Sequence, residues 1–175
     1  MKTRTMFLLV NLLIVFGVFF YEVIKKEKIL DKGELVLFEL APVDPRSLLQ
    51  GDYMQLRYAI TSEMYPSDIP ARGFLALKLR EENIADTVLR SVESLSELQE
   101  GEFPIKYFYN ERFVSIGAES YFFQEGNAGL FEEARYGGLR VSSSGEGVLV
   151  GLYDENRQLI KTEIHPSSAL SGKSD

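Results

Sequence analysis

The longest apolar stretch of the chain lies near its N-terminus, from residue 6 to residue 24. As a helix, its nineteen residues would span roughly 28 Å, close to the thickness of the hydrocarbon core of a bilayer. A cleavable signal peptide would have a shorter apolar core followed by small residues at the cleavage site, and residues 19–26 offer no such site. The pattern therefore predicts an uncleaved transmembrane helix, with residues 6–24 in contact with membrane lipid.

Beyond residue 33 the apolar positions recur in short runs, many of them with a period of two, which is typical of strands with one buried face. The runs expected to form strands are residues 35–40, 54–60, 74–80, 87–95, 103–109, 113–123, 139–141, 147–153 and 158–164. Residues 94–100 and 130–136 have the spacing of brief helices. We therefore predict a mainly β fold, with one N-terminal transmembrane helix followed by an antiparallel β-barrel or sandwich-like domain with one or two short helices.

The chain divides into three parts. Residues 1–30 would form the transmembrane anchor with its basic flanks, residues 31–165 the β-rich domain, and residues 166–175 a small, polar, disordered tail. Residues 29–33 would be a short stalk between the anchor and the domain.

The segment from residue 42 to residue 58 holds the densest set of geometry-fixing residues. Pro45 disfavours the helical region for the preceding Asp44, so Asp44 can cap a single helical turn that ends at Gly51. After this turn, every second side chain from Met54 onward points to the core, and Gln55 and Arg57 point outward.

The sequence of residues 51–58 is Gly-Asp-Tyr-Met-Gln-Leu-Arg-Tyr, which fits G-D-Y-x-x-L-x-Y at every fixed position. This stretch resembles the GDYXXLXY family of membrane-anchored bacterial proteins, as do residues 42–46 and residues 117–126. The resemblance covers residues 34–165 and the anchor. It implies a short cytoplasmic N-terminus, a domain on the outer side of the membrane and association with a polytopic membrane protein, but no reaction.

The two motifs supply the candidate site residues. The first motif comprises Asp44, Pro45, Arg46, Gly51, Asp52, Tyr53, Leu56 and Tyr58; the second comprises Gly117, Glu119, Tyr121, Glu125 and Gly126. The functional interpretation is a polar rim that binds a partner. The structural interpretation is that Asp44 and Asp52 accept bonds from nearby backbone amides while Arg46 pairs with one of them, and it places Tyr58 in the core.

Charge and composition exclude several classes of protein. Residues 31–175 carry fourteen Lys and Arg against twenty-four Asp and Glu, and so acidic a domain repels nucleic acid. The chain has no Cys and a single His, His165, which argues against a zinc site. No cofactor-binding motif is present, because Gly51 stands alone rather than in a glycine-rich phosphate loop.

Catalytic arrangements are poorly supported. Glu119 and Glu125 lie six positions apart, about 20 Å along an extended strand, whereas glycosidase carboxylates lie about 5 to 10 Å apart. No G-x-S-x-G is present, and nothing fixes Ser47 next to Lys78 as a Ser–Lys dyad.

We therefore predict a non-enzymatic accessory protein, anchored by a single pass in the cytoplasmic membrane. Its outer domain would bind another membrane or envelope protein through Asp44, Arg46, Asp52 and Tyr53. Two alternatives stay open. The basic residues flanking the anchor are nearly balanced, which also permits a cytoplasmic domain, and the second motif could serve an envelope hydrolase or carbohydrate-binding module through Glu119 or Glu125 with Tyr121.

Overall fold

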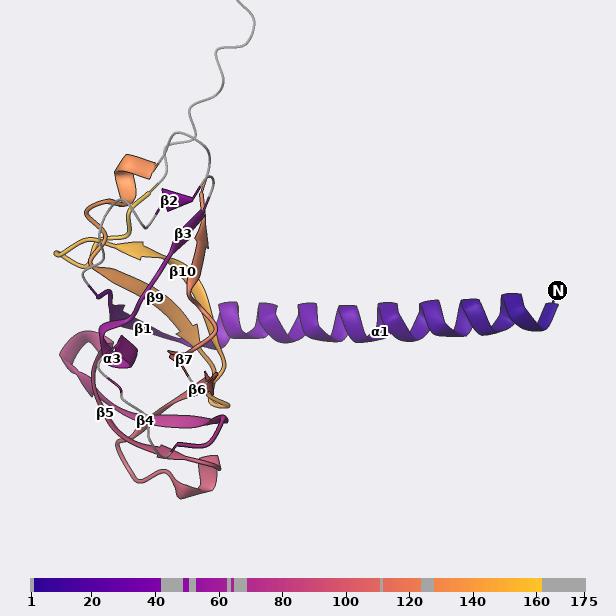
Figure 1. Cartoon of the computed structure of the whole chain (residues 1–175), viewed down its shortest axis with the longest axis horizontal. Coiled ribbons are helices and arrows are strands. Elements are labelled where there is room, and N and C mark those ends of the chain that lie inside the picture. The colour runs from indigo at the N-terminus through magenta and orange to yellow at the C-terminus, as the bar shows by residue number, and fades with distance from the viewer. Residues whose placement is uncertain are drawn as a thin grey trace, which may run out of the picture.

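The computed structural model describes residues 2–41, 49–50, 53–62, 64, 69–110, 112–123 and 128–161. Helix α1 (Lys2–Lys32) projects away from a β-rich domain (Figure 1). It continues past the apolar run because Lys, Glu and Leu at residues 25–32 are good helix formers. The predicted stalk over residues 29–33 is therefore wrong: residues 29–32 form the last turn of α1, and the first strand follows Gly33 directly.

Among the described residues, seven strands form one curled sheet that resembles half of a barrel (Figure 1). Their order is β10-β9-β1-β5-β4-β6-β7. The bounds are β1 (Glu34–Glu39), β4 (Arg72–Arg80), β5 (Ile84–Val92), β6 (Phe103–Tyr109), β7 (Val114–Ser115), β9 (Tyr136–Val141) and β10 (Gly147–Tyr153).

Pairing within this sheet is antiparallel except between β1 and β5. β1 and β5 are parallel, with Leu37 opposite Ile84. The domain is predicted to be mainly antiparallel, and β1–β5 is the one parallel pair among its described strands. After β1 the chain passes through the smaller sheet, described next, before it returns as β4. The β4–β5 hairpin then reverses the chain, so that β5 runs in the same direction as β1.

A smaller sheet carries the motif segments. It contains β2 (Leu49–Gln50), β3 (Tyr53–Gln55) and β8 (Ser120–Phe122), with β3 in the middle. The short helices are α3 (Ala59–Ser62) and the 3₁₀ turns η1 (Glu81–Asn83), η2 (Leu95–Glu97) and η3 (Ala128–Phe131).

Four further predicted elements differ from the structure. Leu49 and Gln50, expected at the end of a helical turn, form strand β2. The strand expected over residues 54–60 ends at Gln55, and the chain turns into α3 after an isolated bridge between Leu40 and Tyr58. The helix expected over residues 130–136 is only η3, followed by β9. The last expected strand is reduced to a bridge between Tyr153 and Leu159, and residues 162–175, with His165, lie outside the described residues.

The core fills the space between the curled sheet and the smaller sheet. Its largest fully buried side chains include Phe38 and Tyr107 from the curled sheet, Tyr58 from the segment that follows β3, and Phe131 from η3. Strands predicted at residues 74–80, 103–109 and 147–153 are confirmed and contribute Leu75, Leu77, Ile105 and Leu152 to the core. The predicted fold class, a mainly β domain behind one apolar helix, is confirmed.

Candidate functional site

The two motif segments lie side by side, although they are more than sixty positions apart. β3 pairs with β8 in antiparallel register, with Met54 opposite Tyr121 and Gln55 opposite Ser120. Beyond the strand end, the Leu56 amide donates to the carbonyl of Glu119 at 2.8 Å. The two motifs therefore form one structural unit.

Tyr58 locks this unit into the core. Its side chain is 1% exposed, and its hydroxyl donates to the carbonyl of Ala118 at 2.6 Å. The ring meets Phe38 edge-on, with the centroids 5.8 Å apart. Burial raises the pKa of Tyr58 far above its ordinary value. The prediction that Tyr58 is a core residue is confirmed.

The predicted alternation after Gly51 is also confirmed where the structure describes it. Met54 and Leu56 are buried, whereas Gln55 and Arg57 are exposed. Leu56 and Tyr58, at fixed positions of the motif, are therefore packing residues, and Gln55 and Arg57 are the described positions of the strand that can meet a ligand.

Several predicted site residues cannot be placed. Asp44, Pro45, Arg46, Gly51, Asp52, Glu125 and Gly126 lie outside the described residues, and for Tyr53 only the backbone, in β3, is described. Their proposed roles stay predictions.

The second motif is organised around a turn at Gly117. This residue has a φ of 79°, a conformation that favours glycine. The Glu119 carboxylate accepts from the amides of Ile116 at 2.6 Å and Gly117 at 3.2 Å, closing the turn. Tyr121 packs edge-on against Phe131, 5.1 Å between centroids. The described part of this motif is thus built mainly from structural contacts.

A groove of about 410 Å³ opens beside the paired motifs, and we call it the motif groove. One wall is the motif strand and α3, and the other is the segment that leads into β7. Its lining residues include Gln55, Leu56, Arg57, Tyr58, Thr61, Ser62, Met64, Arg112, Phe113, Val114 and Glu119. Two exposed guanidinium groups therefore stand beside an apolar floor.

Of these lining residues, sequence reasoning identified only Leu56, Tyr58 and Glu119 as part of a site. The alternation of the motif strand was the available signal for Gln55 and Arg57. Arg112 and Phe113 had no comparable signal, because only the fold brings the β7 segment against the motif strand.

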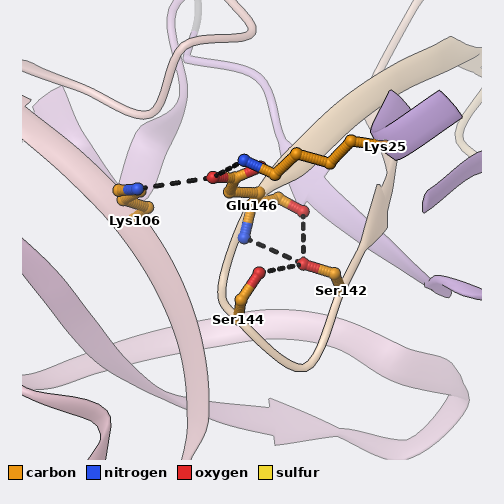
Figure 2. Close-up of polar contacts among 5 residues, drawn as sticks. All are labelled: Lys25, Lys106, Ser142, Ser144 and Glu146. Atoms are coloured by element: carbon orange, nitrogen blue, oxygen red, sulfur yellow. Dashed lines mark hydrogen bonds and ion pairs between the residues drawn. The ribbon is translucent and has the colours of Figure 1, made fainter. Parts of the chain in front are cut away.

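A polar cluster joins α1 to the domain, and we call it the anchor seam. Lys25 and Lys106 reach Glu146 from two sides, at 2.7 Å and 3.4 Å (Figure 2). Ile29 is 4% exposed, and Arg140 donates to the carbonyl of Gly33 at 2.8 Å. The final turns of α1 are therefore fixed to the β9–β10 hairpin rather than linked to it by a loose segment.

Family comparison agrees with the motif geometry. The family model described as GDYXXLXY protein matches residues 15–152. The chain belongs to the GDYXXLXY family. Comparisons with curated proteins and with solved structures gave no match.

The matched region spans both halves of the architecture of this GDYXXLXY protein, from within α1 to β10. α1 is long and apolar enough to cross a membrane. Over the described ranges, no group of three or more acidic or His side chains is arranged to hold a metal ion.

Acidification should weaken the anchor seam. The Lys25 ammonium, donating to Glu146, holds the pKa of that carboxyl below its ordinary value. Because the pKa of Glu146 is lower in the folded protein than in the unfolded chain, its ionised form stabilises the fold at pH values above the unfolded-chain pKa of about 4.3. This contribution to stability is lost as the pH falls through the lowered pKa.

The measurement is the thermal unfolding midpoint of the full chain in mild detergent, followed from pH 7 to about pH 3. Glu146→Gln should lower the free energy of unfolding by about 1 kcal/mol or less at pH 7. It should also reduce the fall of the unfolding midpoint between neutral and acid pH. Glu155→Gln, at an exposed turn, is the matched control. If the unfolding midpoint falls with pH equally steeply in the parent and in Glu146→Gln, this role for Glu146 is contradicted.

Proposed function

We propose that this GDYXXLXY protein is a non-catalytic accessory protein of the cytoplasmic membrane. α1 is a single-pass anchor with a short cytoplasmic N-terminus, and the β-rich domain stands on the outer side. There it binds another membrane or envelope protein, most simply a polytopic membrane protein. The observation that carries the proposal is the motif groove on a domain that the anchor seam joins to α1.

The anchor seam supports this function because it limits the directions in which the motif groove can face. A domain on a loose stalk would lose orientational freedom upon binding, and that loss opposes association. Here Ile29, Glu146 and Arg140 already hold the domain against α1. A partner in the same membrane would meet a preoriented surface.

The chemistry of the motif groove also fits a protein partner. Arg and aromatic residues are enriched at protein interfaces, and the groove offers Arg57, Arg112 and Phe113, the last 55% exposed. The guanidinium groups favour a loop that presents carboxylates beside an apolar side chain. We expect the outer polar residues of the first motif, Asp44 and Asp52 among them, to extend this surface.

The alternative of an envelope hydrolase or carbohydrate-binding module gains little from the described geometry. The Glu119 carboxylate is engaged by the amides of Ile116 and Gly117. A carboxylate committed to closing a turn is poorly placed to act on a substrate.

Photo-crosslinking in native membranes tests the proposal. p-Benzoylphenylalanine at Phe113, in the motif groove, should give one predominant adduct with an integral membrane protein. The same probe at Leu89, an exposed site on β5 outside the groove, should not. Arg57→Glu should abolish the adduct, whereas Lys78→Glu, an exposed cation that does not line the groove, should preserve it.

Two results would overturn the proposal. One is equal adducts from Phe113 and Leu89; the other is an adduct that survives Arg57→Glu. Orientation is tested separately, since the chain has no Cys. A membrane-impermeant maleimide should label Lys78→Cys in intact spheroplasts, and labelling only after lysis would place the domain in the cytoplasm.

A further inference from the structure

A second groove lies where α1 meets the domain, and we call it the junction groove. It has a volume of about 320 Å³. One wall is the last two turns of α1, with Lys25, Lys28 and Lys32, and the other is the loop of Ser142, Ser143 and Ser144 between β9 and β10. Ammonium groups and hydroxyl groups therefore face the same space.

The lysines share one face of the helix because they lie three and four positions apart. Lys25 is compensated by Glu146 at 2.7 Å. Lys28 and Lys32 are exposed, and among the described residues neither forms an ion pair within 4.0 Å. Neither Glu27 nor Asp31 of the same helix lines the groove. The groove thus carries a local positive charge in an otherwise acidic domain.

The serine loop adds hydrogen-bonding capacity. The hydroxyls of Ser142 and Ser144 lie 2.8 Å apart and share a hydrogen bond, while Ser142 also contacts the backbone of Glu146 (Figure 2). Ser143 and Ser144 are exposed. A phosphate oxygen could accept from these hydroxyls and from the neighbouring ammonium groups at once.

The depth of the groove identifies the source of the phosphate. The apolar run ends at residue 24, so Lys28 stands about 6 Å and Lys32 about 12 Å further along the helix axis. The polar layer of a bilayer begins where its hydrocarbon ends and is roughly 5 to 8 Å thick on each side. Lys25 and Lys28 therefore lie at headgroup depth when α1 spans the membrane, and the long side chain of Lys32 can reach back along the helix to the same layer.

We infer that the junction groove binds the phosphate headgroup of an anionic phospholipid. Its acyl chains would run along the exposed apolar face of α1, residues 6–24, while its headgroup contacts Lys28, Lys32 and the serine loop. A lipid held in this way touches both sides of the anchor seam and stabilises the seated domain. The inference rests on the membrane anchoring proposed above, but not on a partner protein.

Spin-labelled lipids test this in proteoliposomes containing the full chain. Labelled phosphatidylglycerol should associate with the protein more strongly than labelled phosphatidylcholine, by about fivefold for each contributing lysine. Lys28→Gln should lower this preference, and Lys28→Gln with Lys32→Gln should nearly abolish it. Lys26→Gln removes the same charge, about 3 Å nearer the hydrocarbon, from a residue that does not line the groove, and should have a smaller effect than Lys28→Gln.

The remaining outcomes are equally decisive. If Lys26→Gln and Lys28→Gln lower the preference for phosphatidylglycerol equally, the lysines attract anionic lipid without forming a site, and the inference is overturned. An absent preference in the parent would also overturn it. Inorganic phosphate, added at constant ionic strength, should not displace the lipid; displacement would identify a site for free phosphate instead. Extraction of the protein from membranes by alkaline carbonate would refute the anchoring itself. If the protein stays in the membrane but binds phosphatidylglycerol and phosphatidylcholine equally, only the inference about the junction groove is refuted.

Discussion

Replacing Tyr58 with alanine is expected to lower the free energy of unfolding of the domain by about 3–5 kcal/mol. The ring is 1% exposed, packs against Phe38 and sits beneath Gly137, where an added Cβ would lie 3.0 Å from it. Its removal leaves a large cavity between the two sheets. Since a typical domain is stable by only about 5–15 kcal/mol, this variant should be partly unfolded.

Tyr58→Phe separates packing from hydrogen bonding. It keeps the ring but removes the donor that the Ala118 carbonyl accepts at 2.6 Å, so we expect a loss of about 1–2 kcal/mol. Leu89→Ala, on an exposed side chain of β5, should cost clearly less than either.

The measurement is urea unfolding of the full chain in mild detergent, followed by the near-ultraviolet circular dichroism of its tyrosines. If Tyr58→Ala lowers the free energy of unfolding no more than Leu89→Ala does, then Tyr58 does not join the sheets. Tyr58→Phe as harmful as Tyr58→Ala would show that the hydrogen bond, rather than packing, dominates.

This prediction separates two roles within the GDYXXLXY motif. The fixed Leu56 and Tyr58 are core residues, and their loss should act on stability. Gln55 and Arg57 occupy unspecified positions of the motif and face the motif groove. Changes there should alter binding and leave the core intact, which is why Arg57→Glu is the variant chosen for crosslinking.

Local pattern was enough to predict much of the fold. Period-two alternation correctly separated buried Met54, Leu56 and Tyr58 from exposed Gln55 and Arg57. It did not show where the strand would end. The hydroxyls of Thr61 and Ser62 both bond to the Tyr58 carbonyl, at 3.1 Å and 2.9 Å, and this local alternative to strand pairing starts α3.

Contacts between distant parts of the chain could not be predicted. The sequence contains no local signal that β1 lies parallel to β5, or that Leu56 bonds to Glu119. The seam was missed for the same reason. From the sequence, residues 29–33 are predicted to be a short stalk, whereas the fold places Ile29 against the domain, where it is 4% exposed.

Replacing Gly33 with alanine should detach α1 from the sheet. A Cβ at this position would overlap the Ile29 carbonyl oxygen and lie 3.2 Å from both the amide nitrogen and the carbonyl oxygen of Val141. All of these atoms belong to the backbone, so no side chain can rotate away. The helix end and β9 must separate, at a cost of about 1–3 kcal/mol, and the bond from Arg140 to the Gly33 carbonyl should be lost.

Because the chain has no Cys, spin labels can be placed at Leu30→Cys and Leu89→Cys, two exposed positions on either side of the seam. The distance between the labels should be narrowly distributed in the parent and broad in Gly33→Ala. Gly17→Ala is the matched control, because a Cβ at Gly17 meets no atom within 4 Å, and its distribution should stay narrow. A narrow, unshifted distribution in Gly33→Ala would mean that the seam tolerates the methyl group and is looser than its contacts indicate.

The Gly33 variant also tests whether a rigid seam matters for binding. The motif groove is built from β3, α3 and the segment that precedes β7, and it contains no residue of α1. Gly33→Ala should therefore leave the groove intact while freeing its orientation. If the domain binds its partner as a preoriented surface, the crosslink from Phe113 should weaken in this variant and persist in Gly17→Ala. If Gly33→Ala broadens the distance distribution but leaves the crosslink from Phe113 undiminished, the motif groove recognises its partner by its own chemistry. The anchor seam would then serve the lipid contact instead.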